Sequence, residues 1–186
     1  MFADNGASRR RWEVASQERI VDQAKSSGGA ILEAVLDAWD RSSRVLINLL
    51  QALPVGGLST RATSGSPSVS QMLMHVHHER LVSVAEEAPE VGVAVPDEEW
   101  QAETDPRRIE RLLEESADAV RSAVISRVAA GRGLDQHFGH PIQLIAFLIF
   151  HEGYHHGQIK LALKASGTPM PDHVAGPQTW DVWRRR

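Results

Sequence analysis

Apolar residues recur every three or four positions in four separate stretches of this 186-residue chain, and that spacing predicts amphipathic helices. Proline and glycine separate the stretches, as expected where helices begin and end. No stretch alternates apolar and polar residues between hairpin turns, so no strand is expected. The expected helices span residues 27–53, 66–87, 105–130 and 140–166. Four such helices joined by loops predict an all-α protein, and specifically a four-helix bundle.

Local signals mark the ends of these helices. Ser66, Asp105 and His140 each precede a proline, and a side-chain acceptor followed by proline suits the first turn of a helix. Gly167 is the expected cap at the end of the last helix. These signals predict where the second, third and fourth helices begin.

The segments outside the four helices have separate expectations. Residues 1–25 are predicted to be an N-terminal extension with a short helix around Trp12 and Ile20, and residues 26–186 to form the bundle. The long acidic loop 88–104 between helices two and three is expected to pack through Trp100. The first residues lack the apolar stretch of a secretory signal, so none is expected, and the longest apolar run, residues 144–150, is too short to cross a membrane. A cytoplasmic protein is therefore expected.

The composition excludes several kinds of chemistry. The chain has no cysteine, which removes disulfides, iron–sulfur clusters, cysteine-ligated zinc and thiol nucleophiles of its own. Its net charge is −4, which argues against a general nucleic-acid or membrane-surface binder. Nine histidines remain to be explained.

Two histidines lie on the core-facing stripe of the last expected helix. His151 and His155 continue the apolar series that includes Leu148 and Ile159, and they are one turn apart. Two such imidazoles can share one metal ion at about 2.0–2.1 Å per nitrogen. Leaving both rings unpaired in a core would cost about 1–3 kcal/mol each. The pair therefore predicts a metal site.

The expected second helix must supply a third ligand, and it carries His75, His77 and His78. His75 and His78 share a face, whereas His77 lies on another. Because this helix is apolar on most sides, its periodicity leaves the choice between His75 and His78 open.

Other motif interpretations fit less well. His151-Glu152-Gly153-Tyr154-His155 matches the H-E-x-x-H pattern of zinc proteases, but no glutamate follows Glu152 and no third histidine stands at the metzincin position. Glu152 and His155 also form half of a di-iron motif whose other half is missing. No lysine follows a glycine, so a phosphate-binding loop is excluded. A mononuclear, histidine-rich metal site remains.

The run His151-x-x-x-His155-His156-Gly157-Gln158 resembles the H-x-x-x-H-R-G-Q signature of the DinB-like (YfiT-like) superfamily. The segment 73–76 and the ending Thr179-Trp180-Asp181-Val182-Trp183 are also similar to this family, so that the resemblance covers about residues 27–183. It implies a bundle in which the helices run up, down, down and up, usually a homodimer. It also implies one divalent metal held by His75, His151 and His155. His156 stands where many members have arginine.

The family includes transferases that use bacillithiol, mycothiol or glutathione, and a mycothiol-dependent maleylpyruvate isomerase. The resemblance therefore implies a low-molecular-weight-thiol (S-) transferase acting on a small-molecule substrate. A metal-dependent hydrolase and a non-catalytic metal-binding stress-response protein are the alternatives. Any thiol must come from a cosubstrate, because the chain has none.

More than one metal ion and more than one acid–base group fit the expected site. Three neutral imidazoles accept Zn²⁺ or Ni²⁺, and also Fe²⁺ or Cu²⁺, with at least one coordination position unfilled. Glu152, Tyr154 and His156 adjoin the ligands in sequence and are the candidate catalytic residues.

Overall fold

The computed structural model describes the backbone of residues 5–184 and the side chains of residues 28–184. Within these residues the regular structure is helical, apart from one isolated antiparallel bridge between Arg61 and Ser68. The helices are α1 (Asn5–Gln51), α2 (Val69–Glu87), α3 (Pro106–Ala129), α4 (Pro141–Ala165), α5 (Asp172–Gln178) and α6 (Trp180–Arg184), with 3₁₀ turns η1 (Gly57–Ser59) and η2 (Pro89–Val91). The predicted all-α fold is confirmed.

The chain divides into two units, residues 1–36 and residues 37–186, and α1 contributes to both. The second unit contains the bundle. The backbone is helical without a break from Asn5 to Gln51, so the expected first helix begins much earlier than residue 27. The short helix expected around Trp12 and Ile20 lies within this stretch, outside the described side chains.

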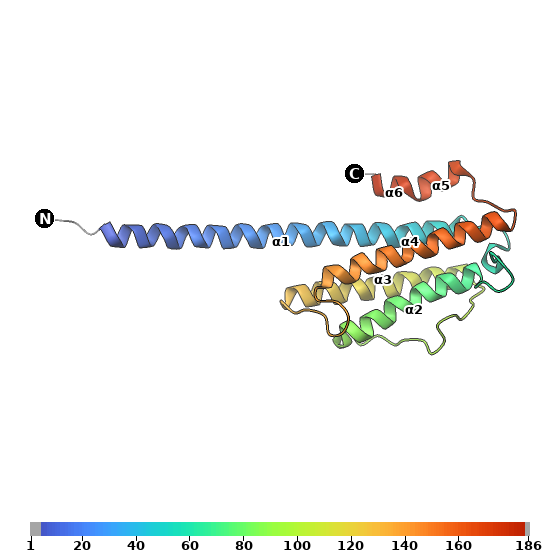
Figure 1. The fold of residues 1–186 in the computed structure, drawn as a ribbon, viewed down its shortest axis with the longest axis horizontal. Coiled ribbons are helices and arrows are strands. Elements are labelled where there is room, and N and C mark those ends of the chain that lie inside the picture. The colour runs from blue at the N-terminus through green and yellow to red at the C-terminus, as the bar shows by residue number, and fades with distance from the viewer. Residues whose placement is uncertain (1–4, 185–186) are drawn as a thin grey trace. The chain divides into compact units, whose positions relative to one another are not determined.

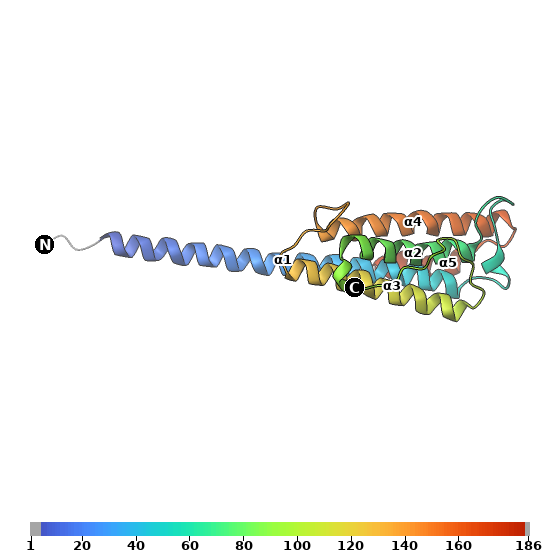
Figure 2. The same ribbon diagram turned by 90° about the horizontal axis from the view of Figure 1, so that it is seen from below.

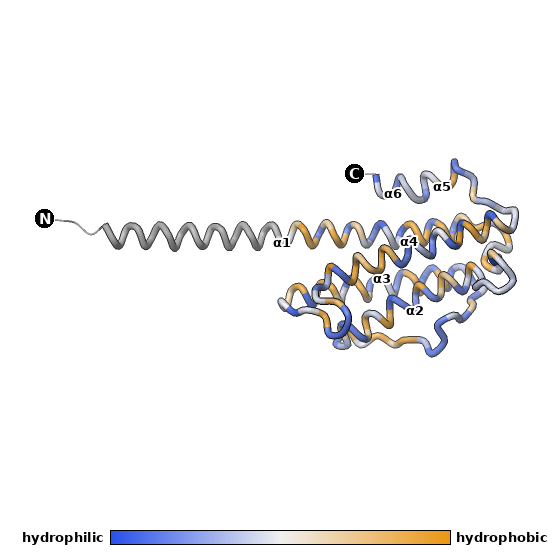
Figure 3. The backbone as a smooth tube through the Cα atoms, in the orientation of Figure 1, coloured by the Kyte–Doolittle hydropathy of each residue, from blue (hydrophilic) through white to orange (hydrophobic). Residues whose placement is uncertain are grey.

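Within the second unit the helices run in the order that the sequence resemblance implied. The end of α1 and the whole of α4 run in one direction, while α2 and α3 run in the other (Figures 1 and 2). Because α2 and α3 are parallel, the segment between them must return along the bundle. Figure 3 shows this segment hydrophobic in its first part and hydrophilic in its second.

The core lies where apolar faces of α1, α2, α3 and α4 meet. Its members are buried, and they include Leu46, Leu49, Leu73, Leu113 and Ile159. The predicted packing of the long loop through Trp100 is also observed, since Trp100 is partly buried against this cluster. None of the described helices combines the length and the hydropathy needed to cross a membrane.

The helix starts confirm two of the three predicted caps. Asp105 accepts a hydrogen bond from the backbone of Arg107, and Nδ1 of His140 accepts one from Ile142. The cap of α2 is Ser68, not Ser66 as the sequence predicted. Ser68 forms a capping box with Gln71, in which each side chain bonds the backbone N–H of the other residue. At the other end of α4, Gly167 adopts φ +80°, as the predicted glycine cap requires.

The C-terminal segment adds α5 and α6, which the sequence did not predict. Both rest on the end of α1: Asn48 donates a hydrogen bond to the carbonyl of Gln178, and Arg41 donates one to the carbonyl of Val182. These short helices have little periodicity of their own, and α5 contains Pro177. Tertiary contacts therefore contribute much of what fixes them.

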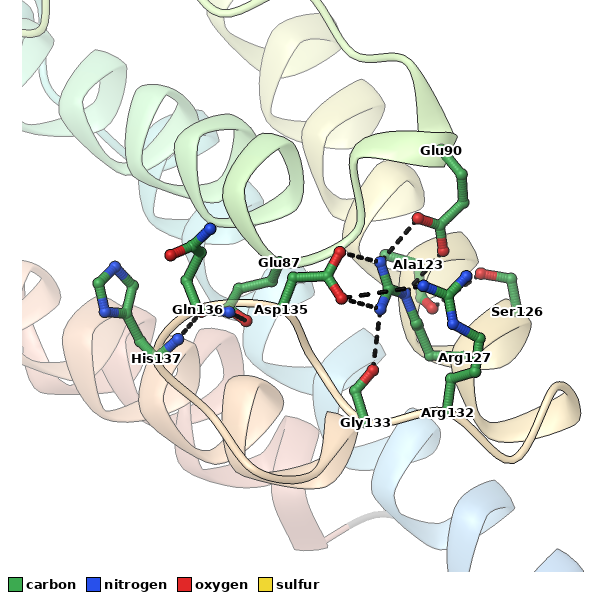
Figure 4. Close-up of polar contacts among 10 residues, drawn as sticks. All are labelled: Glu87, Glu90, Ala123, Ser126, Arg127, Arg132, Gly133, Asp135, Gln136 and His137. Atoms are coloured by element: carbon green, nitrogen blue, oxygen red, sulfur yellow. Dashed lines mark hydrogen bonds and ion pairs between the residues drawn. The ribbon is translucent and has the colours of Figure 1, made fainter.

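A buried guanidinium joins the start of the segment between α2 and α3 to the segment between α3 and α4 (Figure 4). Arg127 on α3 is 1% exposed, and it lies 2.7 Å from a carboxylate oxygen of Glu90 and 2.6 Å from one of Asp135. It also donates a hydrogen bond to the carbonyl of Gly133. This cluster holds the segment that leads into α4, and α4 carries two of the candidate ligands.

Candidate metal centre

Three histidine side chains from two helices converge on one point. Nε2 of His151 lies 3.1 Å from Nε2 of His75 and 3.1 Å from Nε2 of His155. Each ring offers one nitrogen, and these nitrogens lie within 4.8 Å of one another. His75 comes from α2, and the other two from consecutive turns of α4.

On α2 the periodicity left the choice between His75 and His78 open, and the resemblance implied His75. His75 belongs to the cluster, whereas His78 does not. His77, the third histidine of this helix, is buried at 4% exposed. Burial lowers its pKa, and the backbone of Leu112 on α3 opposes that effect. His77 therefore packs toward α3.

The two separations that involve His151 fit one bound cation, and the third lies within 4.8 Å. Two nitrogens each about 2.1 Å from a metal ion lie roughly 3.4 Å apart at a tetrahedral angle and roughly 3.0 Å apart at a right angle. The two observed 3.1 Å separations fall within this range. Hydrogen bonding alone satisfies the cluster poorly, because Nε2 of His151 has only one proton or one lone pair to offer its two neighbours. A cation accepts all three lone pairs at once.

The rings are held in the form that binds a metal. The pKa of His151 is lowered to about 4, first by burial and then by the neighbouring His155, His75 and Arg80. Burial and His75 lower the pKa of His155 to about 4. The pKa of His75 is also lowered, because burial outweighs the effect of Glu99. Neutral imidazoles keep the lone pairs that coordination requires.

The returning loop supplies two partners to His75. Nδ1 of His75 lies 3.0 Å from Oε1 of Glu99. The ring of His75 stacks on Trp100, with centroids 4.1 Å apart and an interplanar angle of 6°. Among the described residues, no other carboxylate comes within ion-pair distance of a ring in the cluster. A carboxylate on the far nitrogen fixes the tautomer of a ligand histidine and orients the ring. The sequence predicted the packing of Trp100 but not the role of Glu99.

An open cavity of about 620 Å³ lies beside the three histidines. Its lining also includes Arg61, Gly65, Ser66, Pro67, Gln71, Trp100, Tyr154 and Gln158. A larger cavity of about 810 Å³ lies at the end of the bundle but contains no histidine. The cavity of about 620 Å³ is therefore the one with candidate metal ligands at its wall, and its size suits a small molecule.

The three candidate catalytic residues are placed on different sides of α4. Tyr154 lines the cavity with the histidines, and its ring lies 5.2 Å from that of His155. Glu152 and His156 instead line a cavity of about 220 Å³ beneath the C-terminal helices, together with Trp180 and Trp183. The structure thus brings only Tyr154 to the cluster, as expected for neighbours separated by about 100° around the helix.

Glu152 is occupied by a buried network. Its Oε1 accepts from Nε of Arg80 at 2.7 Å, and its Oε2 accepts from the hydroxyl of Ser42 at 3.0 Å. Arg80 also donates to the carbonyl of Leu113 on α3 and lies over the ring of Trp39 on α1. The zinc-protease interpretation requires this glutamate in the cleft as a general base, so the geometry argues against it. The network instead ties α4 to the other three helices and fixes which face of α4 presents the candidate ligands.

Comparison with known proteins agrees with this architecture. The model of the DinB superfamily matches residues 38–159, which include α2, α3 and the part of α4 that carries two of the candidate ligands. Neither a curated protein nor a solved structure gave a significant match. The family match covers more than half of the chain, and the helical bundle with its three facing histidines is consistent with it. The chain belongs to the DinB superfamily.

Proposed function

We propose that this protein is a metal-dependent enzyme that transfers the sulfur of a low-molecular-weight thiol to a small electrophilic substrate. The observation that carries the proposal is the convergence of three neutral Nε2 atoms at the wall of an open cavity. His75, His151 and His155 would hold one divalent ion, Zn²⁺ or Ni²⁺ first and Fe²⁺ as a further option. The thiol comes from a cosubstrate, because the chain contains no cysteine.

The proposed reaction needs a thiolate at neutral pH. A bound divalent cation supplies Lewis acidity, which lowers the pKa of a coordinated thiol. The thiol loses its proton, its sulfur bonds to the electrophilic carbon, and the leaving group departs with the electron pair of the broken bond. Glu99 and Trp100 hold the ring of His75 in place during these steps. The hydroxyl of Tyr154, at the same cavity, is our candidate for handling the proton.

Metal-dependent hydrolysis is the second candidate function, and the open cavity favours it over a purely structural metal. Water activation at such a site usually works with a general base. No carboxylate lines the cavity in the described part of the chain, and Glu152 is engaged by Arg80 and Ser42. This difference supports thiol transfer over hydrolysis. A non-catalytic metal-binding role, a homodimer and a cytoplasmic location stay predictions.

A panel of thiols tests the proposal directly. Protein loaded with Zn²⁺ or Ni²⁺ is incubated with monochlorobimane and glutathione, cysteine, mycothiol or bacillithiol, and fluorescence reports the conjugate. We expect turnover with at least one thiol, loss of it in His151→Ala, and retention in His78→Ala, because His78 lies outside the cluster. The proposal would be contradicted if none of the thiols in the panel supports turnover. Metal-dependent hydrolysis of p-nitrophenyl acetate without thiol turnover would favour the second candidate.

A further inference from the structure

The cavity beside the histidine cluster has an uneven charge. Arg61 is the one permanently charged side chain among the described residues that line it. The other polar side chains there are neutral: Ser66, Gln71, Tyr154, Gln158 and the three histidines. No aspartate or glutamate faces this space in the described part of the chain. Glu99 contacts the far nitrogen of His75 but does not line the cavity. A divalent cation held by neutral ligands would add two positive charges against that one carboxylate, so the cavity favours an anionic molecule.

The backbone holds Arg61 at the wall of this cavity. Arg61 forms the isolated bridge with Ser68, the residue that caps α2, and the carbonyl of Thr60 accepts the N–H of Val69. Nη1 of Arg61 donates a hydrogen bond to the carbonyl of Ser66, which orients the guanidinium. The start of α2 therefore fixes Arg61 relative to His75, which lies further along the same helix.

The guanidinium of Arg61 is available to a ligand. The residue is exposed, and within residues 28–184 no carboxylate lies within 4.0 Å of it. A guanidinium has five N–H donors in a planar fork, and the bond to Ser66 uses one nitrogen. The remaining donors match the two oxygens of a carboxylate, which arginine binds in a bidentate manner.

We propose that Arg61 is the specificity-determining residue of this site and that it binds a carboxylate on the thiol cosubstrate. This proposal rests on the proposed function, since it assumes that the sulfur binds at the histidine cluster. The cosubstrate is then a small thiol whose carboxylate and sulfur are separated by the span from Arg61 to the three Nε2 atoms. A neutral thiol of the same length can enter the cavity, but the donors of Arg61 that Ser66 does not use are left without a ligand partner.

The test measures binding rather than turnover. Isothermal titration of the zinc-loaded full chain compares mercaptocarboxylates from thioglycolate to 6-mercaptohexanoate with their neutral amides. We expect the best carboxylate to bind about tenfold more tightly than its amide. Arg61→Gln abolishes this preference without changing the zinc content or the affinity for the amides. Arg61→Lys keeps part of it, because an ammonium retains the charge but not the fork.

Arg107→Gln is the matched control. Arg107 is also an exposed arginine, and it shares the larger cavity with Arg61, but only Arg61 also lines the cavity beside the histidines. This variant should keep the full preference. The proposal is overturned if Arg61→Gln also keeps the preference for the carboxylate over the amide. It is equally overturned if the parent protein shows no such preference with a ligand of any length in the series.

A hydroxyl series separates this proposal from the proposed function. Hydroxycarboxylates of the same lengths and their amides lack sulfur but still present the carboxylate to Arg61. A carboxylate preference that depends on Arg61 in both series supports the role of Arg61 even if thiols bind no better than alcohols. That equality would instead contradict thiol activation at the cluster. Absence of binding in both series contradicts both proposals.

Discussion

Nη2 of Arg80 lies 2.7 Å from Oε1 of Glu152, and both side chains are only 1% exposed. The exposed pair Arg121 and Asp40 has the same 2.7 Å separation, with side chains 37% and 56% exposed. The two pairs therefore differ in burial and not in length. Removing one partner of a buried pair leaves an uncompensated charge in the core, whereas an exposed partner is solvated by water.

Arg80→Met should lower the free energy of unfolding by about 3–5 kcal/mol. Arg121→Met, the control, should lower it by less than about 1 kcal/mol. Urea denaturation of both variants measures the difference. Equal losses would mean that the buried network does not hold the helices together as described. Restoration by the double variant Arg80→Met/Glu152→Met would support the charge-based explanation over a packing defect.

Replacing any ligand should remove the metal. His75→Ala, His151→Ala and His155→Ala each leave two nitrogens, and we expect the affinity for Zn²⁺ to fall by more than about 100-fold, beyond the usual effect of changing a ligand's neighbour. Metal content after dialysis, measured by plasma mass spectrometry, checks this. His78→Ala should retain the metal, because His78 is not in the cluster. A variant that keeps stoichiometric zinc would remove its residue from the site.

Glu99 should act on the metal through His75. Its carboxylate lies 3.0 Å from Nδ1 of that ring, so Glu99→Gln weakens the partner that fixes the tautomer. We expect the affinity for Zn²⁺ to fall by about tenfold, measured by competition with a chelator of known affinity. Glu98→Gln, at the neighbouring exposed position, is the control and should change little. Equal effects of the two variants would assign the change to net charge and not to the contact.

The Arg127 cluster should make the fold sensitive to acid. Hydrogen bonds from Arg127 lower the pKa of both Glu90 and Asp135 in the folded protein. Their contribution to stability is therefore complete above the unfolded pKa values near 4, and it is lost as the pH falls through the lower folded values. Glu90→Gln/Asp135→Asn should reduce Tm at pH 7 by roughly 2–4 °C and flatten its fall between pH 5 and 3.

The control for this acid effect is Asp97→Asn/Glu98→Gln, which removes two exposed carboxylates. It should follow the pH profile of the parent protein. Differential scanning fluorimetry from pH 3 to 7 compares all three proteins. A control that flattens the profile equally would assign the effect to net charge.

Periodicity predicted the parts of the molecule in which neighbouring residues decide the structure. The bundle and the pair His151 and His155 follow from a 3.6-residue repeat, which the sequence carries directly. The first helix continues through Gly28 and Gly29, because a helical glycine costs only about 1 kcal/mol and does not by itself end a helix. The apolar pattern therefore did not predict that this helix begins at Asn5.

The remaining features depend on contacts between distant segments. Ser66 and Ser68 both precede the apolar run, and only the reciprocal bonds with Gln71 identify Ser68 as the cap. Glu99 reaches His75 because the loop returns along the bundle, and no local repeat in the loop signals that contact. Arg61 lies in a loop as well, so its position beside the cavity follows from the fold alone.

The distance along the chain between the ligands has a consequence for folding. His75 and His151 are 76 positions apart, and the chain has no cysteine with which to form a disulfide. A metal that binds both residues would act as a cross-link between α2 and α4. By the loop-entropy relation for cross-links, closing a loop of this length is worth about 4–5 kcal/mol. Because α4 is the last of the four long helices to be synthesised, this cross-link can form only after α1, α2, α3 and most of α4 have left the ribosome.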